Sequence, residues 1–272
     1  MRTVLAAALL GLAAAASTLW AYQAHLIFEP DRRLHASPAD FPFPVRDVSV
    51  PVQSPGRAPQ RLQGWWLPSR DPSARIVLYL HGNDGNLSTS VREVAPLREL
   101  GYSVFMIDYR GYGASEGGFP SEKSVYEDAE AAWSYLVRGD VRPREIYIYG
   151  HSLGGAIAIE LARRHPEAAG LVVESSFTSI YDMAMLDKRY AWLPVRQFLT
   201  HRFESLSKVP ELRLPVLYLH GTADEIVPAA MGRRLFEASG GEKRFVALEG
   251  GRHDHDATRG AALTAALRDF IR

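Results

Sequence analysis

Short runs of apolar residues, mostly β-branched or aromatic, alternate along the chain with segments in which apolar residues recur every three or four positions. Each short run predicts a strand buried on both faces, because neither face has a regular polar position. Six such strands are predicted at 75–80, 102–107, 146–149, 170–174, 216–219 and 245–248. Five helices are predicted at 91–100, 124–136, 154–164, 229–239 and 261–271.

This alternation predicts an α/β fold, with a mostly parallel central sheet and helices on both of its faces. The segment 179–212 breaks the alternation, since it is rich in aromatic residues and methionine but has no strand pattern. We expect a small helical cap insertion there, over an apolar pocket, with ordinary packing of an extra helix pair as the alternative. Residues 25–60 hold many prolines and predict a lead-in of turns and edge strands before a main domain at 61–272.

The chain begins with an apolar run that contains no Asp, Glu, Lys or Arg between Thr3 and Phe28. A helix needs about 20 apolar residues to cross the core of a bilayer. With Arg2 ahead of it, the run predicts a single-pass membrane anchor at 1–24 that leaves the rest of the chain on the non-cytoplasmic side. A signal peptide cleaved near Ala16, giving a secreted or periplasmic protein, is the main alternative, and a helix of the folded domain is a third.

Composition narrows the class of protein only slightly. The 272 residues include 31 basic and 31 acidic side chains, so no net charge attracts the chain to nucleic acid, and we expect no nucleic-acid partner. Hydrophobic residues at 47% and charged residues at 23% are typical of a globular protein rather than a disordered one. Cysteine is absent, which excludes disulfides, thiolate nucleophiles and cysteine-ligated metals.

The pentapeptide GHSLG at 150–154 is the strongest chemical signal in the sequence. It follows the predicted strand at 146–149 directly and opens the predicted helix at 154–164. This is the context of a G-x-S-x-G nucleophile elbow, in which a tight turn exposes the serine hydroxyl and small flanking residues let strand and helix approach. The pattern predicts Ser152 as a catalytic nucleophile.

A serine hydroxyl needs a base that is oriented by a third group. Asp224 ends the motif HGTAD after one predicted strand, and His253 follows the predicted strand at 245–248. The order Ser152, Asp224, His253 is the one expected of a strand–elbow–helix hydrolase. The alternatives that the sequence leaves open are Glu225 and Glu174 for the acid and His255 for the base.

Hydrolysis by a serine also needs two backbone N–H groups that bind the oxyanion of the tetrahedral intermediate. Leu153, the residue after the nucleophile, would supply one of them. Asn83, in the glycine-rich loop after the predicted strand at 75–80, is the candidate for the other. We expect His81 to hold this loop through side-chain hydrogen bonds rather than to act as a base.

Together these motifs resemble those of the α/β-hydrolase superfamily over about 61–272. The motifs are HGN at 81–83, DYRGYGAS at 108–115, GHSLG at 150–154, HGTAD at 220–224 and GRH at 251–253. With its apolar N-terminus, the chain is most similar to single-span, membrane-anchored serine hydrolases related to the α/β-hydrolase-domain esterases and depalmitoylases. The resemblance implies that the triad is Ser152, Asp224 and His253, that the oxyanion donors are Asn83 and Leu153, and that no cofactor or metal is needed.

The sequence therefore predicts a serine hydrolase that cleaves carboxylic ester or thioester bonds through an acyl-enzyme intermediate. The apolar residues of 179–212 favour a small-molecule or lipid-like acyl substrate, and the N-terminal run favours the membrane as a second partner. The alternatives are a serine peptidase of the same fold and a non-catalytic, membrane-tethered binding protein. The sequence leaves the oligomeric state open.

Overall fold

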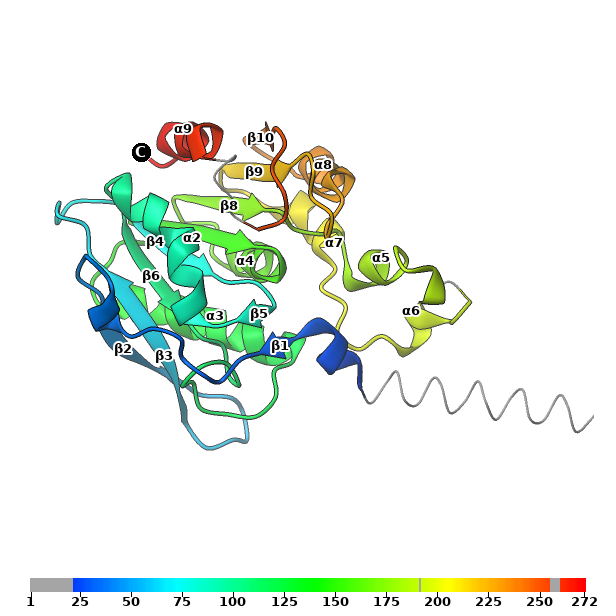
Figure 1. Ribbon diagram of the computed structural model, residues 1–272, viewed down its shortest axis with the longest axis horizontal. Coiled ribbons are helices and arrows are strands. Elements are labelled where there is room, and N and C mark those ends of the chain that lie inside the picture. Colours follow the sequence, from blue (N-terminus) through cyan, green and yellow to red (C-terminus); the bar gives the residue numbers. More distant parts are fainter. Residues whose placement is uncertain (1–21, 191, 255–259) are drawn as a thin grey trace, which may run out of the picture.

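An eight-stranded sheet forms the centre of the computed structural model, which describes residues 22–190, 192–254 and 260–272 (Figure 1). The strand order is β10-β9-β8-β7-β4-β6-β3-β2. The strands are β2 (Arg46–Val52), β3 (Gln60–Leu67), β4 (Ile76–Leu80), β6 (Ser103–Ile107), β7 (Ile146–His151), β8 (Gly170–Glu174), β9 (Val216–Gly221) and β10 (Lys243–Leu248). β3 alone runs opposite to the other seven strands, so only its pairs with β2 and β6 are antiparallel, and the prediction of a mostly parallel sheet is confirmed.

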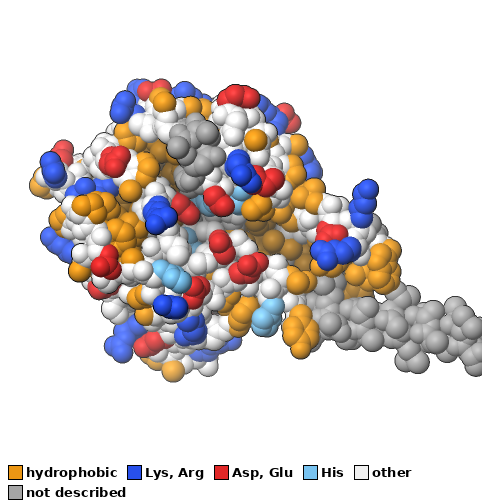
Figure 2. Space-filling view, in the orientation of Figure 1, with side chains coloured by type: hydrophobic (Ala, Val, Ile, Leu, Met, Phe, Trp, Pro, Cys, Tyr) orange, Lys and Arg blue, Asp and Glu red, His pale blue; other side chains and the backbone are white. Residues whose placement is uncertain are grey.

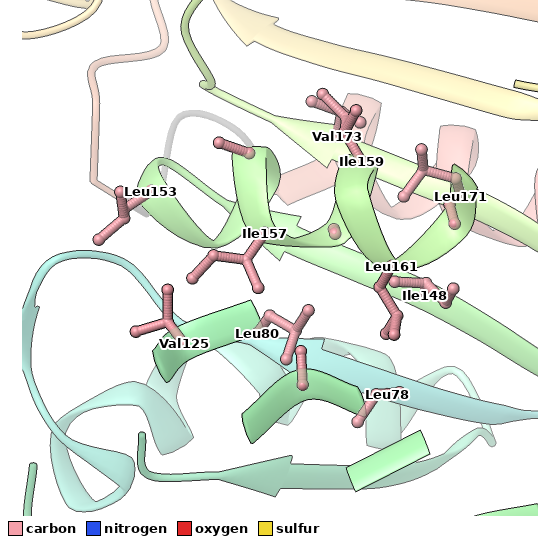
Figure 3. Close-up of a cluster of buried hydrophobic side chains, with 14 of the residues drawn as sticks. Leu78, Leu80, Val125, Ile148, Leu153, Ile157, Ile159, Leu161, Leu171 and Val173 are labelled. Atoms are coloured by element: carbon pink, nitrogen blue, oxygen red, sulfur yellow. The ribbon is translucent and has the colours of Figure 1, made fainter. Parts of the chain in front are cut away.

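Helices cover both faces of the sheet, as the alternating pattern predicted. One face carries α3 (Glu122–Arg138), α4 (Leu153–Arg164) and α8 (Ala229–Ala238), and the other carries α2 (Leu87–Glu99) and α9 (Gly260–Phe270). Alternate residues of β4 face the helices on opposite sides of the sheet. Leu78 and Leu80 pack with α4, while Val77 and Tyr79 pack with α2. Figure 3 shows the first of these two cores, which anchors α4 against the sheet.

The prediction that every strand is buried on both faces is wrong for β10. Of its six residues only Leu248 is buried, because β10 lies at the edge of the sheet and pairs with β9 alone. At the other edge, β2 pairs with β3, and the apolar pattern did not predict β3. A second, two-stranded sheet pairs β1 (Glu29–Pro30) with β5 (Asp84–Gly85) and ties the N-terminal region to the loop after β4.

The insertion between β8 and β9, called the cap below, is helical. It contains α5 (Ile180–Ala184), α6 (Val195–Phe198) and α7 (Ser205–Lys208), with two 3-10 turns at Lys188–Tyr190 and Val209–Glu211. In Figure 1, α5 and α6 project from the body of the protein beyond the ends of the strands.

A short helical segment at 22–27 is the first part of the chain that the structure describes, and it is bound to the cap. The buried Gln23 side chain donates a hydrogen bond to the Phe198 carbonyl oxygen (3.3 Å) and accepts one from the Thr200 N–H (2.7 Å). Most of the predicted anchor or signal peptide at 1–24 lies outside the described residues. Within 22–190, 192–254 and 260–272, none of the helices is both long enough and apolar enough to span a membrane.

Candidate active site

Ser152 occupies a strained turn between β7 and α4. Its φ of 53° and ψ of −119° lie in a region that residues with a side chain rarely adopt, at a cost of order 1–3 kcal/mol. Hydrogen bonds on both sides hold the turn: the Ser152 N–H donates to the Glu174 carbonyl oxygen (2.9 Å), and the Ser176 hydroxyl donates to the Ser152 carbonyl oxygen (2.8 Å). The hydroxyl is thereby presented at the carboxyl end of the strand, as the elbow motif predicted.

Two glycines allow β7 and α4 to come this close. A Cβ atom added at Gly150 would lie 2.1 Å from the carbonyl oxygen of Gly154. A Cβ atom added at Gly154 would lie 2.0 Å from the carbonyl oxygen of Leu80, at the end of β4. Both obstacles are backbone atoms, so no side-chain rotation can relieve the overlap.

Replacing Gly154 with alanine is therefore expected to lower the free energy of unfolding by about 3 kcal/mol, because the end of β4 must move away from the helix. Thermal unfolding followed by circular dichroism measures the loss. The matched control is Gly118→Ala, since a Cβ atom at Gly118 would meet nothing within 4 Å. Equal melting temperatures for the two variants would contradict the close contact.

The structure brings together the three residues predicted as a triad. His253 Nε2 lies 3.0 Å from Ser152 Oγ, and His253 Nδ1 lies 2.9 Å from Asp224 Oδ2. Because a carboxylate only accepts hydrogen bonds, Nδ1 is the protonated nitrogen and Nε2 is free to accept the serine proton. Both Ser152 and His253 are buried, at 7% and 5% exposure. This is the arrangement of nucleophile, base and orienting acid that serine catalysis requires.

Asp224 is held as a carboxylate by several donors. Burial alone would raise its pKa, but hydrogen bonds from His220, His253 and the Val227 N–H outweigh burial and hold the pKa well below its usual value. The Val227 N–H lies 2.8 Å from Oδ1, and His220 Nε2 lies 3.3 Å from Oδ2. His220 was not identified from the sequence, although its place four residues before Asp224, at the end of β9, is a signal that could have pointed to it.

The other acids considered for the triad have different partners. The Glu174 carboxylate accepts a hydrogen bond from the Tyr149 hydroxyl, and Glu225 is exposed and accepts one from Arg252 Nε (2.8 Å). The other candidate base, His255, lies outside the described residues. Where the chain is described, no group of three His, Asp or Glu side chains is placed to hold a metal ion.

The loop after β4 holds the predicted oxyanion donor in a fixed orientation. His81 Nδ1 lies 2.9 Å from the Gly82 carbonyl oxygen, and the N–H of the same peptide, which belongs to Asn83, points to the opposite side. The Asn83 carbonyl oxygen accepts hydrogen bonds from the Tyr112 hydroxyl (2.6 Å) and the Glu29 N–H (2.9 Å). The peptides on both sides of Asn83 are thus braced.

Leu153 is the first residue of α4, so its N–H has no carbonyl partner within the helix. Leu153 and Asn83 line the same cavity as Ser152. Asn83 and Leu153 therefore border the same cavity as the serine hydroxyl, which is where an oxyanion would develop.

His81 is placed to hold the loop and not to accept a proton. Burial lowers the pKa of His81 to about 4 and raises the pKa of the neighbouring Asp108 carboxyl to about 8. Their nearest polar atoms, His81 Nε2 and Asp108 Oδ1, are 3.7 Å apart. The lowered pKa disfavours His81 as a proton acceptor, and its imidazole contributes through the hydrogen bond that it donates to the Gly82 carbonyl oxygen.

A cavity of about 360 Å³ opens at Ser152. Most of its wall is apolar and comes from three parts of the chain: the segment 22–27, the cap, and the loop after β9. The apolar lining residues include Leu26, Ile27, Met183, Tyr190, Leu199 and Val227. A larger groove, of about 810 Å³, lies between β2 and α3 and contains none of the triad residues.

Comparison with known proteins gives matches over most of the chain. Residues 71–208 match the profile of a family described as "Hydrolase_4: Serine aminopeptidase, S33". An uncharacterized protein of Mycobacterium tuberculosis is 36% identical over 256 residues, which are 93% of this chain and 88% of that protein. The lysophosphatidylserine lipase ABHD12 of Danio rerio is 34% identical over 66% of this chain and 51% of the lipase. The solved structure of the Pyrococcus furiosus esterase Pf2001 superposes with a TM-score of 0.68 at 20% identity, over 90% of this chain and 98% of the esterase.

Proposed function

This chain belongs to the α/β-hydrolase superfamily, and on that basis we propose that it is a serine hydrolase that cleaves carboxylic ester or thioester bonds through an acyl-enzyme intermediate. The observation that carries the proposal is the 3.0 Å distance between His253 Nε2 and Ser152 Oγ, with His253 Nδ1 bonded to the Asp224 carboxylate. The similarity to a protein named as a lipase supports an acyl ester as the substrate.

In the proposed reaction, Ser152 Oγ attacks the carbonyl carbon while His253 Nε2 takes the hydroxyl proton. The carbonyl oxygen becomes an oxyanion and accepts hydrogen bonds from the backbone N–H groups of Asn83 and Leu153. When the intermediate collapses, His253 gives its proton to the leaving oxygen or sulfur, and the acyl group stays on Ser152. Water then attacks the acyl carbonyl as His253 takes one of its protons. When this second intermediate collapses, the bond between the acyl carbon and Ser152 Oγ breaks, His253 returns the proton to Oγ, and the acid is released.

The wall of the cavity supports an apolar acyl group as the part of the substrate that is bound. Apolar side chains of the cap face the segment 22–27 across the cavity, so an acyl chain placed there would be removed from water. Each buried methylene contributes about 0.8 kcal/mol to binding. Esters with longer acyl chains are therefore expected to have higher kcat/KM values until the cavity is filled.

Amide hydrolysis is the second candidate, because the matching family is described as a serine aminopeptidase. An aminopeptidase needs a free negative group that binds the substrate ammonium. The acidic residue of the described cavity wall is Asp187, and its carboxylate is paired with Arg189 at 2.6 Å. Hydrogen bonding to Arg189 also lowers the pKa of Asp187. This neutralised pair favours esters over N-terminal peptides.

The test uses the full chain in detergent with p-nitrophenyl esters of increasing acyl length, matched thioesters and matched amino-acid p-nitroanilides. We expect ester turnover to exceed anilide turnover and kcat/KM to rise with acyl length. Turnover of anilides alone would favour the peptidase. Esterase activity that is independent of acyl length would contradict an acyl-binding cavity.

The same proposal includes a location. We propose that the apolar run at 1–24 anchors the chain in a membrane with the hydrolase domain on the non-cytoplasmic side, and the alternative is a secreted or periplasmic protein after cleavage. Carbonate extraction of cell membranes distinguishes the two. An anchored protein stays in the pellet, whereas a cleaved one is released.

Removing the imidazole that braces the oxyanion loop is expected to slow turnover without weakening substrate binding. His81→Ala leaves the Gly82 carbonyl oxygen without its side-chain donor, so the Asn83 N–H loses its fixed direction. Loss of one oxyanion donor lowers kcat by about 10²-fold or more. In His81→Asn the side-chain amide can donate to the same oxygen, and we expect kcat to recover in part with KM unchanged. Identical kcat values for the two variants would contradict this role.

A further inference from the structure

Exposed apolar side chains are concentrated around the mouth of the cavity. Of seven large apolar side chains exposed in the described part of the chain, six lie at this mouth or beside the segment 22–27, and they are called the mouth surface below. They are Tyr22, Leu26, Phe119, Leu186, Trp192 and Ile226. Figure 2 shows hydrophobic side chains gathered on the cap, where the molecule projects. A patch of this kind marks an interaction site.

Two of these residues line the cavity, and the others neighbour its lining in the sequence or contact the segment 22–27. Leu26 and Ile226 line the cavity, and Leu186 and Trp192 flank the lining stretch 187–190. The Phe119 ring stacks on the ring of His25 in the segment 22–27, with centroids 4.0 Å apart. The exposed fractions are large, reaching 66% for Trp192 and 60% for Tyr22, so these side chains are accessible to a binding partner.

The N-terminal sequence indicates what lies next to the mouth surface. The apolar run leads directly into Tyr22, and the next residue, Gln23, is bonded to the cap at Phe198 and Thr200. The end of a run long enough to cross a bilayer is therefore fixed at the mouth of the cavity. Tryptophan and tyrosine at such a position are typical of the membrane–water interface.

The charges of the cap also suit the membrane–water interface. Between Ile180 and Arg202 there are four basic side chains and two acidic ones, although the whole chain is neutral. The basic residues are Lys188, Arg196, Arg202 and Arg189, and the last of these is paired with Asp187. Basic side chains beside exposed apolar ones suit a membrane surface with anionic headgroups.

We propose that the mouth surface docks on a lipid bilayer, so that the enzyme takes long-chain acyl esters directly from the membrane. This inference rests on the proposed ester hydrolase function. An acyl chain leaving the bilayer would pass between the segment 22–27 and the cap and reach Ser152 without crossing water. The mouth surface is thus assigned to substrate delivery, and the triad to chemistry.

The test compares two substrates with the same leaving group on the full chain, reconstituted in vesicles of phosphatidylcholine and phosphatidylglycerol. One substrate is soluble p-nitrophenyl butyrate, and the other is p-nitrophenyl palmitate dissolved in the vesicle membrane. The double variant Leu186→Glu with Trp192→Glu is expected to lose at least about ten-fold in turnover of the palmitate, because charges disfavour the bilayer. Butyrate turnover is expected to be retained. Tyr135→Glu, at the seventh exposed site on α3, is the matched control and should retain both.

Retained palmitate turnover in the double variant would overturn the proposal, and so would an equal loss on both substrates, which would assign these side chains to the cavity itself. A second measurement does not depend on activity: brominated lipids should quench Trp192 fluorescence, and the quenched fraction should fall in Trp192→Phe. Lack of this quenching would contradict docking on a bilayer and would favour a protein as the partner of the mouth surface. Failure of wild-type protein to hydrolyse either ester would instead contradict the proposed function, while the quenching still tests the docking.

Discussion

Replacing Ser152 with alanine is expected to lower kcat/KM for a soluble ester by at least about 10⁴-fold. The variant keeps the elbow, the base and both backbone donors, but it has no hydroxyl to form the acyl-enzyme. Because alanine shares the Cβ atom of serine, the strained backbone at φ 53° is unchanged and the melting temperature should stay close to that of wild type. Labelling by a fluorophosphonate probe should disappear with the activity.

The matched control is Ser176→Ala, which removes a neighbouring buried hydroxyl that bonds to the Ser152 carbonyl oxygen. This variant should still be labelled by the probe. Esterase activity of Ser152→Ala within a few-fold of wild type would rule out Ser152 as the nucleophile. Absence of labelling in folded wild-type protein would favour the non-catalytic binding protein.

Replacing Asp224 with asparagine is expected to lower kcat by about 10³- to 10⁴-fold. A carboxylate accepts the Nδ1 hydrogen of His253 and leaves Nε2 to take the serine proton. An asparagine amide can donate to Nδ1, which favours the opposite tautomer and blocks the base. Glu225→Gln is the control, since Glu225 is in the same loop but bonds to Arg252. Equal losses in the two variants would contradict the assignment of Asp224.

The pH dependence of stability gives an independent measurement on Asp224→Asn. The pKa of Asp224 is held well below its usual value in the folded protein, so its carboxylate stabilises the fold above the unfolded pKa of about 3.9. This contribution falls progressively as the pH drops from the unfolded pKa toward the lower folded pKa. The melting-temperature gap between wild type and variant should therefore be constant from about pH 8 to about pH 5 and should narrow below about pH 4. A gap that closes near neutral pH would point to a different group.

Runs of apolar residues were sufficient to predict the strands that are buried on both faces. The runs at 146–149 and 170–174 lie in the middle of the sheet, where every position is buried because helices cover both faces. The same rule failed for β10, because an edge strand leaves half of its surface to solvent. It also failed for β3, where polar residues alternate with buried ones such as Trp65, although the strand has a neighbour on each side.

For the site, each motif predicted a residue at the carboxyl end of a parallel strand, and such ends meet at one edge of the sheet. That geometry explains how Ser152, Asp224 and His253 were chosen from sequence. The contacts that the sequence did not reveal are those made by side chains across long separations, such as Gln23 with Phe198. They also include contacts of a residue to which no role was assigned, such as His220 with Asp224. The sequence near such a residue does not indicate which distant residue its side chain will contact.

The bond between Gln23 and the cap also limits where the proposed N-terminal anchor or signal peptide could be cleaved without loss of the cavity wall. Gln23 holds the backbone at Phe198 and Thr200, and Leu26 and Ile27 complete the wall of the cavity. A peptidase that trims the leader on the amino-terminal side of Gln23 leaves the wall intact, whereas a cut after Ile27 releases part of the active site. N-terminal sequencing of active protein from its native host should therefore find every chain starting at or before residue 23. The segment 22–27 and the cap therefore form one structural unit, so a chimera between relatives must take both from the same protein.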